Sequence, residues 1–275
     1  MNIPTGLGSF DAMLGGGLPR GKYIILSGLP ASGKTTLCLN AVANANRLGL
    51  KCAWFDLENA YEASHAASIG VTEVDVIEPD FGEQAAEQLE KFLREKKYDL
   101  IIFDSAPAVT ALSEREAEYG AAPMMARARL ISTMARKILV PLRQSGTAVV
   151  FTNHLSVNIM GGQYDPFKEA SGNTLAYYSS AMFRMKRLGQ LKEGEDVVGV
   201  LVEIGCPRKN RLAPSGQKAE LKLFWKGGFS SQSDKLSEML KNGEVTKKGR
   251  FWYQGAERVA SSEKDARVWA ATLSQ

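Results

Sequence analysis

A glycine-rich segment that also holds a lysine and two threonines has the most recognisable chemistry in the chain. It reads SGLPASGKTT over residues 27–36 and fits the phosphate-loop pattern G-x-x-x-x-G-K-[ST]. Glycines let the main chain approach a ligand closely, and inward-pointing N–H groups then surround a phosphate chain. The pattern predicts a nucleotide-binding loop made of Gly28, Leu29, Pro30, Ala31, Ser32, Gly33, Lys34, Thr35 and Thr36.

Two side chains of this loop have distinct expected tasks. Lys34 would place a point charge on the β and γ phosphates, and the Thr35 hydroxyl would hold Mg²⁺. A helix beginning here would also direct the positive end of its dipole at the phosphates. The alternative is a glycine-rich turn with an incidental lysine. The flanks favour the phosphate loop, because KYIILSG before it is apolar and β-branched and TTLCLNAVANANRLG after it has helical spacing of apolar residues.

Carboxylates at the ends of two predicted strands would complete such a site. Asp104 ends the apolar run in LIIFDS, the Walker B form that supports Mg²⁺, although many core strands also end in Asp. Glu58 and Asp56, in WFDLENA, lie near the end of another predicted strand. Ligands of open α/β sheets bind beyond the carboxyl ends of strands, so Glu58 would face the γ phosphate and orient or deprotonate a water. The alternative is a solvated loop carboxylate or a ribose-binding one.

The elements that must position these residues alternate between strands and helices. Strand-like runs YIILSG, CAWFDLE, LIIFDSA and AVVFTNHL are separated by helical patterns at 34–48, 83–97 and 122–144. This alternation predicts right-handed crossovers and a parallel sheet. After residue 180, AMFRMKRLG, VVGVLVEIG and AELKLFW indicate antiparallel strands that extend one edge of the sheet. We therefore expect a core over residues 1–228 and a small C-terminal lobe over residues 229–275.

Composition limits the class of protein but does not identify a binding partner. The chain has 275 residues, 44% of them hydrophobic, which suits one large α/β domain with a small appendage. Its net charge of +4 permits a nucleic-acid partner without demanding one. Three scattered cysteines without metal spacing suit a reducing compartment, and no segment has the length of a signal peptide or a membrane span. We expect a cytoplasmic protein that does not bind membranes.

Several segments, in the same order along the chain, resemble those of the RecA-type recombinases. They are GLPASGKTT, FDLENA, DFGEQAAEQLE, IIFDSAPAV, SGNTLAYYSSAMFRMKRLG, KEGEDVVG, KNRLAP and LSEMLKNGEVTKKGRFWYQGAERV. The resemblance covers nearly the whole chain. It implies a RecA-like P-loop NTPase core, with a mainly parallel central sheet flanked by helices, antiparallel edge strands and a small C-terminal α/β lobe. It also implies a DNA-dependent ATPase that uses ATP and Mg²⁺.

The resemblance assigns roles to individual residues. Glu58 falls on the catalytic glutamate of the family, and His65 falls where an aromatic residue stacks on adenine. His154 takes the place of the glutamine that senses the γ phosphate, as in the UvsX-type recombinases of phages; its alternative is a polar cap at a strand end. Lys209 and Arg211 fall on basic residues that reach the ATP of a neighbouring subunit, in the manner of arginine fingers; their alternative is a solvated turn.

The resemblance also places two DNA-binding loops, at about residues 113–124 and 155–170. Loops of this length in a compact domain are usually functional or disordered. Main-chain N–H groups would hold phosphates, and apolar side chains would enter between bases. Because the loops hold few basic residues, affinity would depend on many subunits acting together. The DNA-contacting residues expected are Arg127, Ile159, Met160, Gly161, Gly162, Tyr164, Phe167, Lys168, Ser171 and Gly172.

Three functions remain open at this point. The first is a homo-oligomeric ATPase, with ATP between subunits, that coats single-stranded DNA and pairs it with homologous duplex. The family's N-terminal arm, which builds the filament, and its acidic C-terminal tail have no counterpart in the sequence as given. A second function is therefore an annealing helper or recombination mediator that forms no filament. A hexameric helicase-like motor is the third, and the matches at KNRLAP and in the C-terminal lobe disfavour it.

Overall fold

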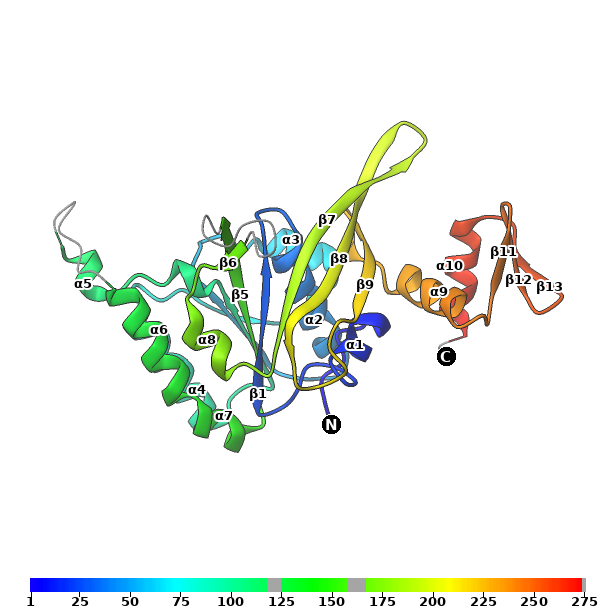
Figure 1. Cartoon of the computed structure of the whole chain (residues 1–275). Coiled ribbons are helices and arrows are strands. Elements are labelled where there is room, and N and C mark those ends of the chain that lie inside the picture. Colours follow the sequence, from blue (N-terminus) through cyan, green and yellow to red (C-terminus); the bar gives the residue numbers. More distant parts are fainter. Residues whose placement is uncertain (118–124, 158–166, 274–275) are drawn as a thin grey trace.

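The computed structural model of this chain describes residues 1–117, 125–157 and 167–273. Within them, one mixed sheet has the strand order β10-β9-β8-β7-β1-β5-β4-β2-β3, and β6 pairs with β5 (Figure 1). The strands from β3 to β7 in this order are parallel, whereas the β7–β8, β8–β9 and β9–β10 pairs are antiparallel. The expected parallel sheet with an antiparallel edge is confirmed. The strands are β1 (Lys22–Gly28), β2 (Cys52–Asp56), β3 (Asp75–Ile77), β4 (Leu100–Asp104), β5 (Ala148–Val157), β6 (Phe167–Glu169), β7 (Ala181–Glu193), β8 (Asp196–Asn210), β9 (Lys218–Phe224) and β10 (Gly228–Phe229).

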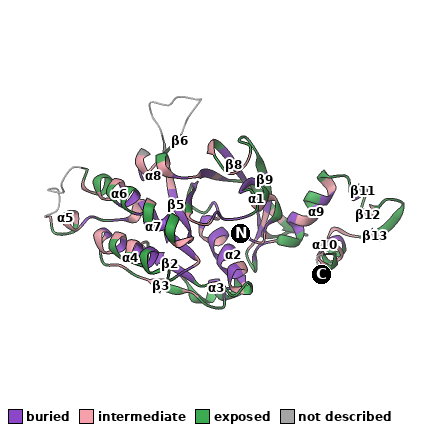
Figure 2. Ribbon diagram, turned by 90° about the horizontal axis from the view of Figure 1, so that it is seen from below, coloured by how far each residue is buried: buried purple, intermediate pink, exposed green. Residues whose placement is uncertain are grey.

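Helices cover both faces of this sheet, and each face has its own hydrophobic cluster. Ile24 and Leu26 of β1 pack with α1, α2 and α3, whereas Tyr23 and Ile25 pack with α4, α6, α7 and α8. Successive strand residues point to opposite faces, so the central parallel strands are apolar on both sides. Buried residues accordingly lie between the layers (Figure 2). The core helices are α1 (Gly8–Met13), α2 (Lys34–Arg47), α3 (Ala63–Ile69), α4 (Gly82–Glu95), α5 (Leu112–Arg115), α6 (Ala126–Lys137), α7 (Leu139–Ser145) and α8 (Asn173–Tyr178), with a 3₁₀ turn at Ala106–Ala108.

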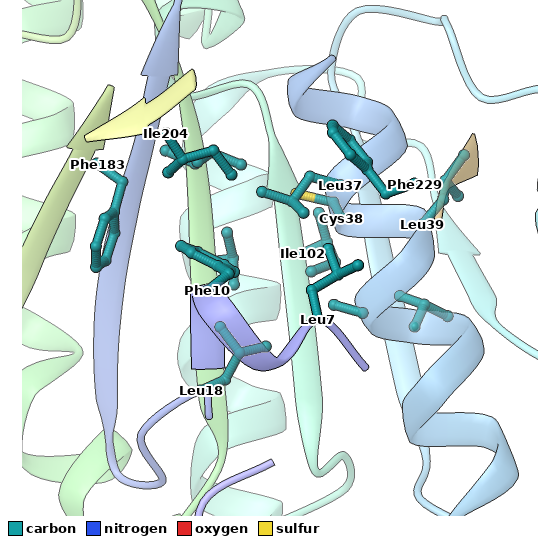
Figure 3. Close-up of a cluster of buried hydrophobic side chains, with 14 of the residues drawn as sticks. Leu7, Phe10, Leu18, Leu37, Cys38, Leu39, Ile102, Phe183, Ile204 and Phe229 are labelled. Atoms are coloured by element: carbon teal, nitrogen blue, oxygen red, sulfur yellow. The ribbon is translucent and has the colours of Figure 1, made fainter. Parts of the chain in front are cut away.

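The helix that follows the glycine-rich loop is held firmly in the first of these clusters. Leu37 and Cys38 of α2 lie beside Ile102 of β4 and Phe10 of α1 (Figure 3). All of these side chains are at most 2% exposed. Burying apolar side chains of this size contributes roughly 1.5–3 kcal/mol each. The apolar face of α2 therefore fixes the position of the loop at its N-terminus.

The structure has two helices where the sequence predicted a single one. The pattern at 122–144 becomes α6, which ends at Lys137, and α7, which begins at Leu139; residues 122–124 lie outside the described part of the chain. Pro141 has no N–H group to donate, and its ring clashes with the carbonyl of the residue four positions earlier. That residue is Lys137. The break is thus a local consequence of one proline.

The C-terminal residues form a small α/β unit beyond the edge of the sheet (Figure 1). Its own hydrophobic cluster includes Leu236, Trp252 and Ala266. The unit meets the core through Asp234, a buried residue whose carboxylate accepts hydrogen bonds from the main chain and the hydroxyl of Ser9 in α1. Its elements are α9 (Ser231–Lys241), β11 (Thr246–Lys248), β12 (Phe251–Gln254), β13 (Glu257–Ala260) and α10 (Glu263–Thr272).

The structure also bears on membranes and cysteines. In the described part of the chain, no helix has the length and apolar character needed to cross a bilayer. Cys38, Cys52 and Cys206 are buried and form no disulfide.

Candidate nucleotide-binding and catalytic site

The predicted site residues meet at the carboxyl ends of neighbouring parallel strands. In the sheet register, Gly28 of β1 lies opposite His154 of β5, and Asp56 of β2 lies opposite Asp104 of β4. Glu58 follows two residues after the end of β2. Since β1, β5, β4 and β2 are consecutive in the sheet, the phosphate loop, Glu58, Asp104 and His154 occupy one edge. This is the edge at which open α/β sheets bind ligands.

The shape of the loop requires glycine at two positions. A Cβ atom on Gly28 would lie 2.3 Å from Ser32 Oγ and 3.0 Å from the carbonyl oxygen of Met185. Gly33 has a φ of +93°, and a Cβ there would lie 3.0 Å from a methyl carbon of Leu223. A side chain at either position would therefore fill or distort the cradle. Gly33 is also the N-cap of α2, so the N–H groups at the start of α2 face the loop.

The donors that line this loop fit a polyanion. Lys34 is 7% exposed, and its Nζ donates to the carbonyl oxygens of Gly28, at 3.1 Å, and Leu29, at 3.3 Å. Burial lowers the pKa of the Lys34 ammonium, although the charges of Asp104 and Glu58 oppose this effect. The Ser32 hydroxyl is buried and has no hydrogen-bond partner among the described residues. Buried donors of this kind ordinarily have acceptors, and phosphate oxygens would supply them.

Beside the loop, oxygen atoms of Thr35 and Asp104 form a set that suits Mg²⁺. Thr35 Oγ1 donates to Asp104 Oδ2 at 3.0 Å, and Thr152 Oγ1 donates to Asp104 Oδ1. Burial raises the pKa of Asp104, while the hydrogen bonds from Thr152 and Thr35 act in the opposite direction. Mg²⁺ prefers hard oxygen ligands and usually takes only one or two from protein, with waters and substrate phosphates completing its shell. The residues present therefore fit this cation.

Glu58 and His154 are in direct contact. His154 Nε2 lies 2.7 Å from Glu58 Oε1, and the Ser105 hydroxyl donates to the same oxygen. Burial raises the pKa of Glu58, but the hydrogen bonds from Ser105 and His154 and the nearby charges of His154 and Lys34 outweigh it, so that the net pKa is lowered. Glu58 is therefore ionised at neutral pH. Because an ionised carboxylate only accepts hydrogen bonds, His154 carries its proton on Nε2 in this contact.

Two contacts of this site were not predicted from sequence. Ser105 immediately follows Asp104, and Thr152 lies two residues before His154. Both belong to segments already singled out, FDS and FTNH, so their places in those motifs were the available signal. Asp56, by contrast, does not join the site. Its carboxylate accepts the N–H groups of Ala60 at 3.1 Å and Tyr61 at 2.9 Å, and thereby closes the turn that presents Glu58.

The remaining residues expected to act on the nucleotide lie on separate elements. His65 is half-buried on α3, and its adenine-stacking role stays a prediction. The Lys209 ammonium donates to the carbonyl oxygens of Ala176, at 3.0 Å, and Tyr177, at 2.5 Å, at the C-terminal end of α8. Burial and the charge of Arg211 lower the pKa of Lys209. Arg211 itself is exposed.

The residues expected to contact DNA are described only in part. Arg127 lies in α6 and donates to the carbonyl oxygen of Pro107 at 3.2 Å. Phe167 and Lys168 lie in β6, and the main-chain N–H of Ser171 donates to Asn153 Oδ1 at 3.2 Å. Gly172 follows with a φ of +78°. The other expected residues lie outside the described part of the chain: Ile159, Met160, Gly161, Gly162 and Tyr164.

A phosphate loop between a buried parallel strand and a helix, with an acid at the end of a neighbouring strand, defines the class of P-loop NTPases. Residues 1–230 match the family model described as the RecA N-terminal domain, and the chain belongs to the RecA family of recombinases. The predicted family is thereby confirmed.

Individual relatives agree with this assignment over most of the chain. Protein RecA of Syntrophus aciditrophicus (strain SB) is 35% identical over 268 residues, which cover 96% of this chain and 78% of that protein. Protein RecA of Geobacter sulfurreducens is 33% identical over 270 residues, covering 97% of this chain and 80% of that one. The crystal structure of the RadB recombinase has the same fold, with a TM-score of 0.61 at 21% identity over 82% of this chain and 98% of that chain.

Proposed function

We propose that this protein hydrolyses ATP in response to single-stranded DNA and pairs that strand with a homologous duplex in recombination and repair. The observation that carries the proposal is the path of β5. His154 of this strand contacts Glu58, and the strand ends three residues later, at Val157. The chain then returns through β6 to Ser171 and Gly172. One strand thus joins the carboxylate proposed for catalysis to the segment proposed for DNA.

The nucleotide site has the groups that phosphoryl transfer to water requires. The loop N–H groups, the Ser32 hydroxyl and the Lys34 ammonium would bind the triphosphate. Thr35 and Asp104 would hold Mg²⁺, which when bound neutralises charge on the phosphate oxygens. Glu58, ionised at neutral pH, would orient a water and take its proton. Holding these groups in place and stabilising charge supply most of the catalysis in reactions of this type.

A homo-oligomer with ATP at the subunit interface would complete this site. Arg211 is exposed, and Lys209 lies two residues away on β8. A basic side chain supplied by a neighbour stabilises the charge of the transition state in many phosphoryl-transfer enzymes. We place Arg211 and Lys209 in this role toward the adjoining subunit. Lys209 would exchange its two carbonyl partners on α8 for phosphate oxygens.

DNA would be bound by the segment that follows β5 and by α6. Phe167, Lys168, Ser171 and Gly172 lie on or next to β6, and Arg127 lies near the start of α6. Main-chain N–H groups next to a glycine with positive φ suit phosphate binding, and an aromatic side chain suits stacking on bases. We propose single-stranded and double-stranded DNA as the partners.

Phosphate release, measured with and without a single-stranded oligonucleotide, tests the central claim. We expect hydrolysis that the oligonucleotide accelerates, together with strand exchange between this oligonucleotide and a labelled homologous duplex. Electron microscopy with a non-hydrolysable ATP analogue tests the assembly. Helical filaments support the recombinase. Rings or isolated particles that anneal complementary strands would indicate an annealing helper or mediator instead, and a chain that does not hydrolyse ATP would overturn the proposal.

A further inference from the structure

A buried carboxylate outside the nucleotide site joins three strands of the sheet. Glu169 is the last residue of β6, and its side chain is only 4% exposed. Its Oε2 accepts hydrogen bonds from Ser27 Oγ at 2.5 Å and from Asn153 Nδ2 at 2.7 Å. Its Oε1 lies 3.5 Å from Arg184 Nε. One carboxylate thus contacts side chains of β1, β5 and β7.

The sheet register explains why these three side chains converge. Ser27 pairs with Asn153 between β1 and β5, and with Arg184 between β1 and β7. The three residues therefore stand at one level of neighbouring parallel strands and point to the same face. Ile25, two residues before Ser27, packs in the cluster of α4, α6, α7 and α8. Glu169 accordingly lies on the face of the sheet opposite to α2 and the phosphate loop.

The residues that contact Glu169 are direct chain neighbours of the nucleotide site. Ser27 precedes Gly28, the first glycine of the phosphate loop, and Asn153 precedes His154, the partner of Glu58. A shift of Gly28 or His154 along its strand would therefore shift a donor of Glu169. Buried polar groups resist losing such partners, because an unmade hydrogen bond in the interior leaves a desolvated donor or acceptor without compensation.

Two residues that contact this carboxylate, Asn153 and Arg184, also hold the segment that we propose for DNA contact. The N–H of Ala170 donates to the carbonyl oxygen of His154 at 3.0 Å, and the N–H of Ser171 donates to Asn153 Oδ1 at 3.2 Å. On the other side, Arg184 donates to the carbonyl oxygen of Phe167 at 3.3 Å. The main chain on both sides of Glu169 is thus hydrogen-bonded to β5 and β7, two of the strands whose side chains contact the carboxylate.

We propose that Glu169 is a positioning residue that couples the nucleotide site to the polynucleotide-contacting segment. The proposal rests on the proposed function, since it needs both ligands. The coupling would run through contacts of Ser27 and Asn153, the chain neighbours of Gly28 and His154. Both donate to Glu169, and Asn153 also accepts the N–H of Ser171. Coupling of this kind is reciprocal, so nucleotide strengthens DNA binding by the same factor by which DNA strengthens nucleotide binding.

The test measures the coupling factor itself. The dissociation constant of a fluorescent oligothymidylate is determined with and without a non-hydrolysable ATP analogue, and the ratio of the two constants is the coupling. For the wild type we expect a ratio of roughly fivefold or more. Glu169→Ala is expected to bring the ratio close to one. Glu169→Gln keeps an acceptor for Ser27 and Asn153 and is expected to retain most of it.

Two further variants make the test specific. Ser27→Ala removes one hydroxyl and one donor to Glu169, and we expect it to lower the ratio as well. Glu203→Ala is the matched control: it removes a strand carboxylate that is ion-paired with Lys218 at 3.1 Å, with the same change of charge, and should leave the ratio unchanged. Thermal melting establishes that each variant is folded.

The outcomes separate this inference from the proposed function. A wild-type chain that binds neither nucleotide nor oligonucleotide defeats the proposed function. A wild type that binds both without coupling, or a folded Glu169→Ala variant with the wild-type ratio, defeats the role of Glu169 alone. Should Glu169→Ala fail to fold, Ser27→Ala decides, and an unchanged ratio in that variant overturns the inference.

Discussion

His154 Nε2 lies 2.7 Å from Glu58 Oε1 although 96 residues separate them in the chain. The contact brings a carboxylate from the turn after β2 to a side chain of β5, with β4 between these two strands in the sheet. Together with the hydrogen bond from Ser105, this contact keeps the pKa of Glu58 low despite partial burial. The contact also links β5, the strand that leads toward the proposed DNA segment, directly to Glu58, the proposed catalytic group.

Replacement of Lys34 by alanine should nearly abolish ATP hydrolysis. The variant loses the buried ammonium that faces the loop carbonyl oxygens, and removal of one such charge-stabilising group typically costs a factor of about 10²–10³ in rate. Phosphate release by the purified variant is the measurement. Lys22→Ala, at the exposed start of β1, is the matched control and should hydrolyse ATP normally. Normal turnover in Lys34→Ala would show that the loop takes no part in ATP hydrolysis.

Replacement of Glu58 by glutamine should separate binding from hydrolysis. Glutamine keeps the size of the side chain but is not a base, and loss of a general base typically slows a reaction by about 10²–10⁴. We expect the variant to bind a fluorescent ATP analogue with wild-type affinity and to release phosphate at least about a hundredfold more slowly. Glu78→Gln, at an exposed position just past β3, should have no effect. Rapid hydrolysis by Glu58→Gln would assign the base elsewhere.

The identity of residue 154 should matter through its hydrogen bond to Glu58. His154→Ala removes the donor, and a hydrogen bond to a charged group contributes about 1.5–3 kcal/mol, so we expect hydrolysis to fall by about tenfold to a hundredfold. His154→Gln retains a donor and should keep a larger part of the rate. Single-turnover kinetics with and without oligonucleotide distinguish the two variants. Wild-type rates of hydrolysis in both variants would show that the reaction does not use this contact.

Glu58 should also make stability depend on pH with a definite sign. Burial raises its pKa, but the hydrogen bonds from Ser105 and His154 and the charges of His154 and Lys34 bring it below the ordinary 4.5. The resulting stabilisation is fully present above the unfolded-state pKa and is lost as pH falls through the lower folded-state value. Urea unfolding of the wild type and Glu58→Gln should therefore show a free-energy difference that shrinks between about pH 6 and pH 3. A difference that grows on acidification would contradict the assigned shift.

An interface role for Arg211 predicts complementation between two inactive variants. The shared site would take Glu58 from one subunit and Arg211 from its neighbour. Arg211→Ala and Glu58→Gln each remove one of these two groups, so neither variant should hydrolyse ATP efficiently alone. In an equal mixture, about one quarter of the interfaces combine an intact Glu58 with an intact Arg211, if subunits pair at random. We expect phosphate release to recover to about that fraction of the wild-type rate. Absence of recovery, in mixtures shown by light scattering to assemble, would place Arg211 outside the site.

Much of the fold and the loop could be predicted because the signals are local. The phosphate loop is a run of ten residues whose glycines are required by their own backbone and nearest contacts. The strands and α2 follow from the spacing of apolar residues. The break between α6 and α7 also has a local cause, Pro141. It was missed because the helical spacing of apolar residues continues across the break.

The contacts that give these residues their roles could not be predicted in the same way. Asp56 and Glu58 are two residues apart and equally acidic, yet one closes a turn and the other meets His154. Lys209 lies beside α8 because β7 and β8 pair in one particular register. Glu169 belonged to no sequence motif, and its three partners are brought together by strand order and register.

The sequence by itself determined the class of fold, the family and the residues that we propose to bind phosphate, because the spacing of residues within individual segments sets them. Only the tertiary structure decided which carboxylate meets which donor across β1, β5, β4 and β7. The physical reason is that hydrogen bonds act over about 3 Å, and only the sheet register brings residues distant in the chain within that range.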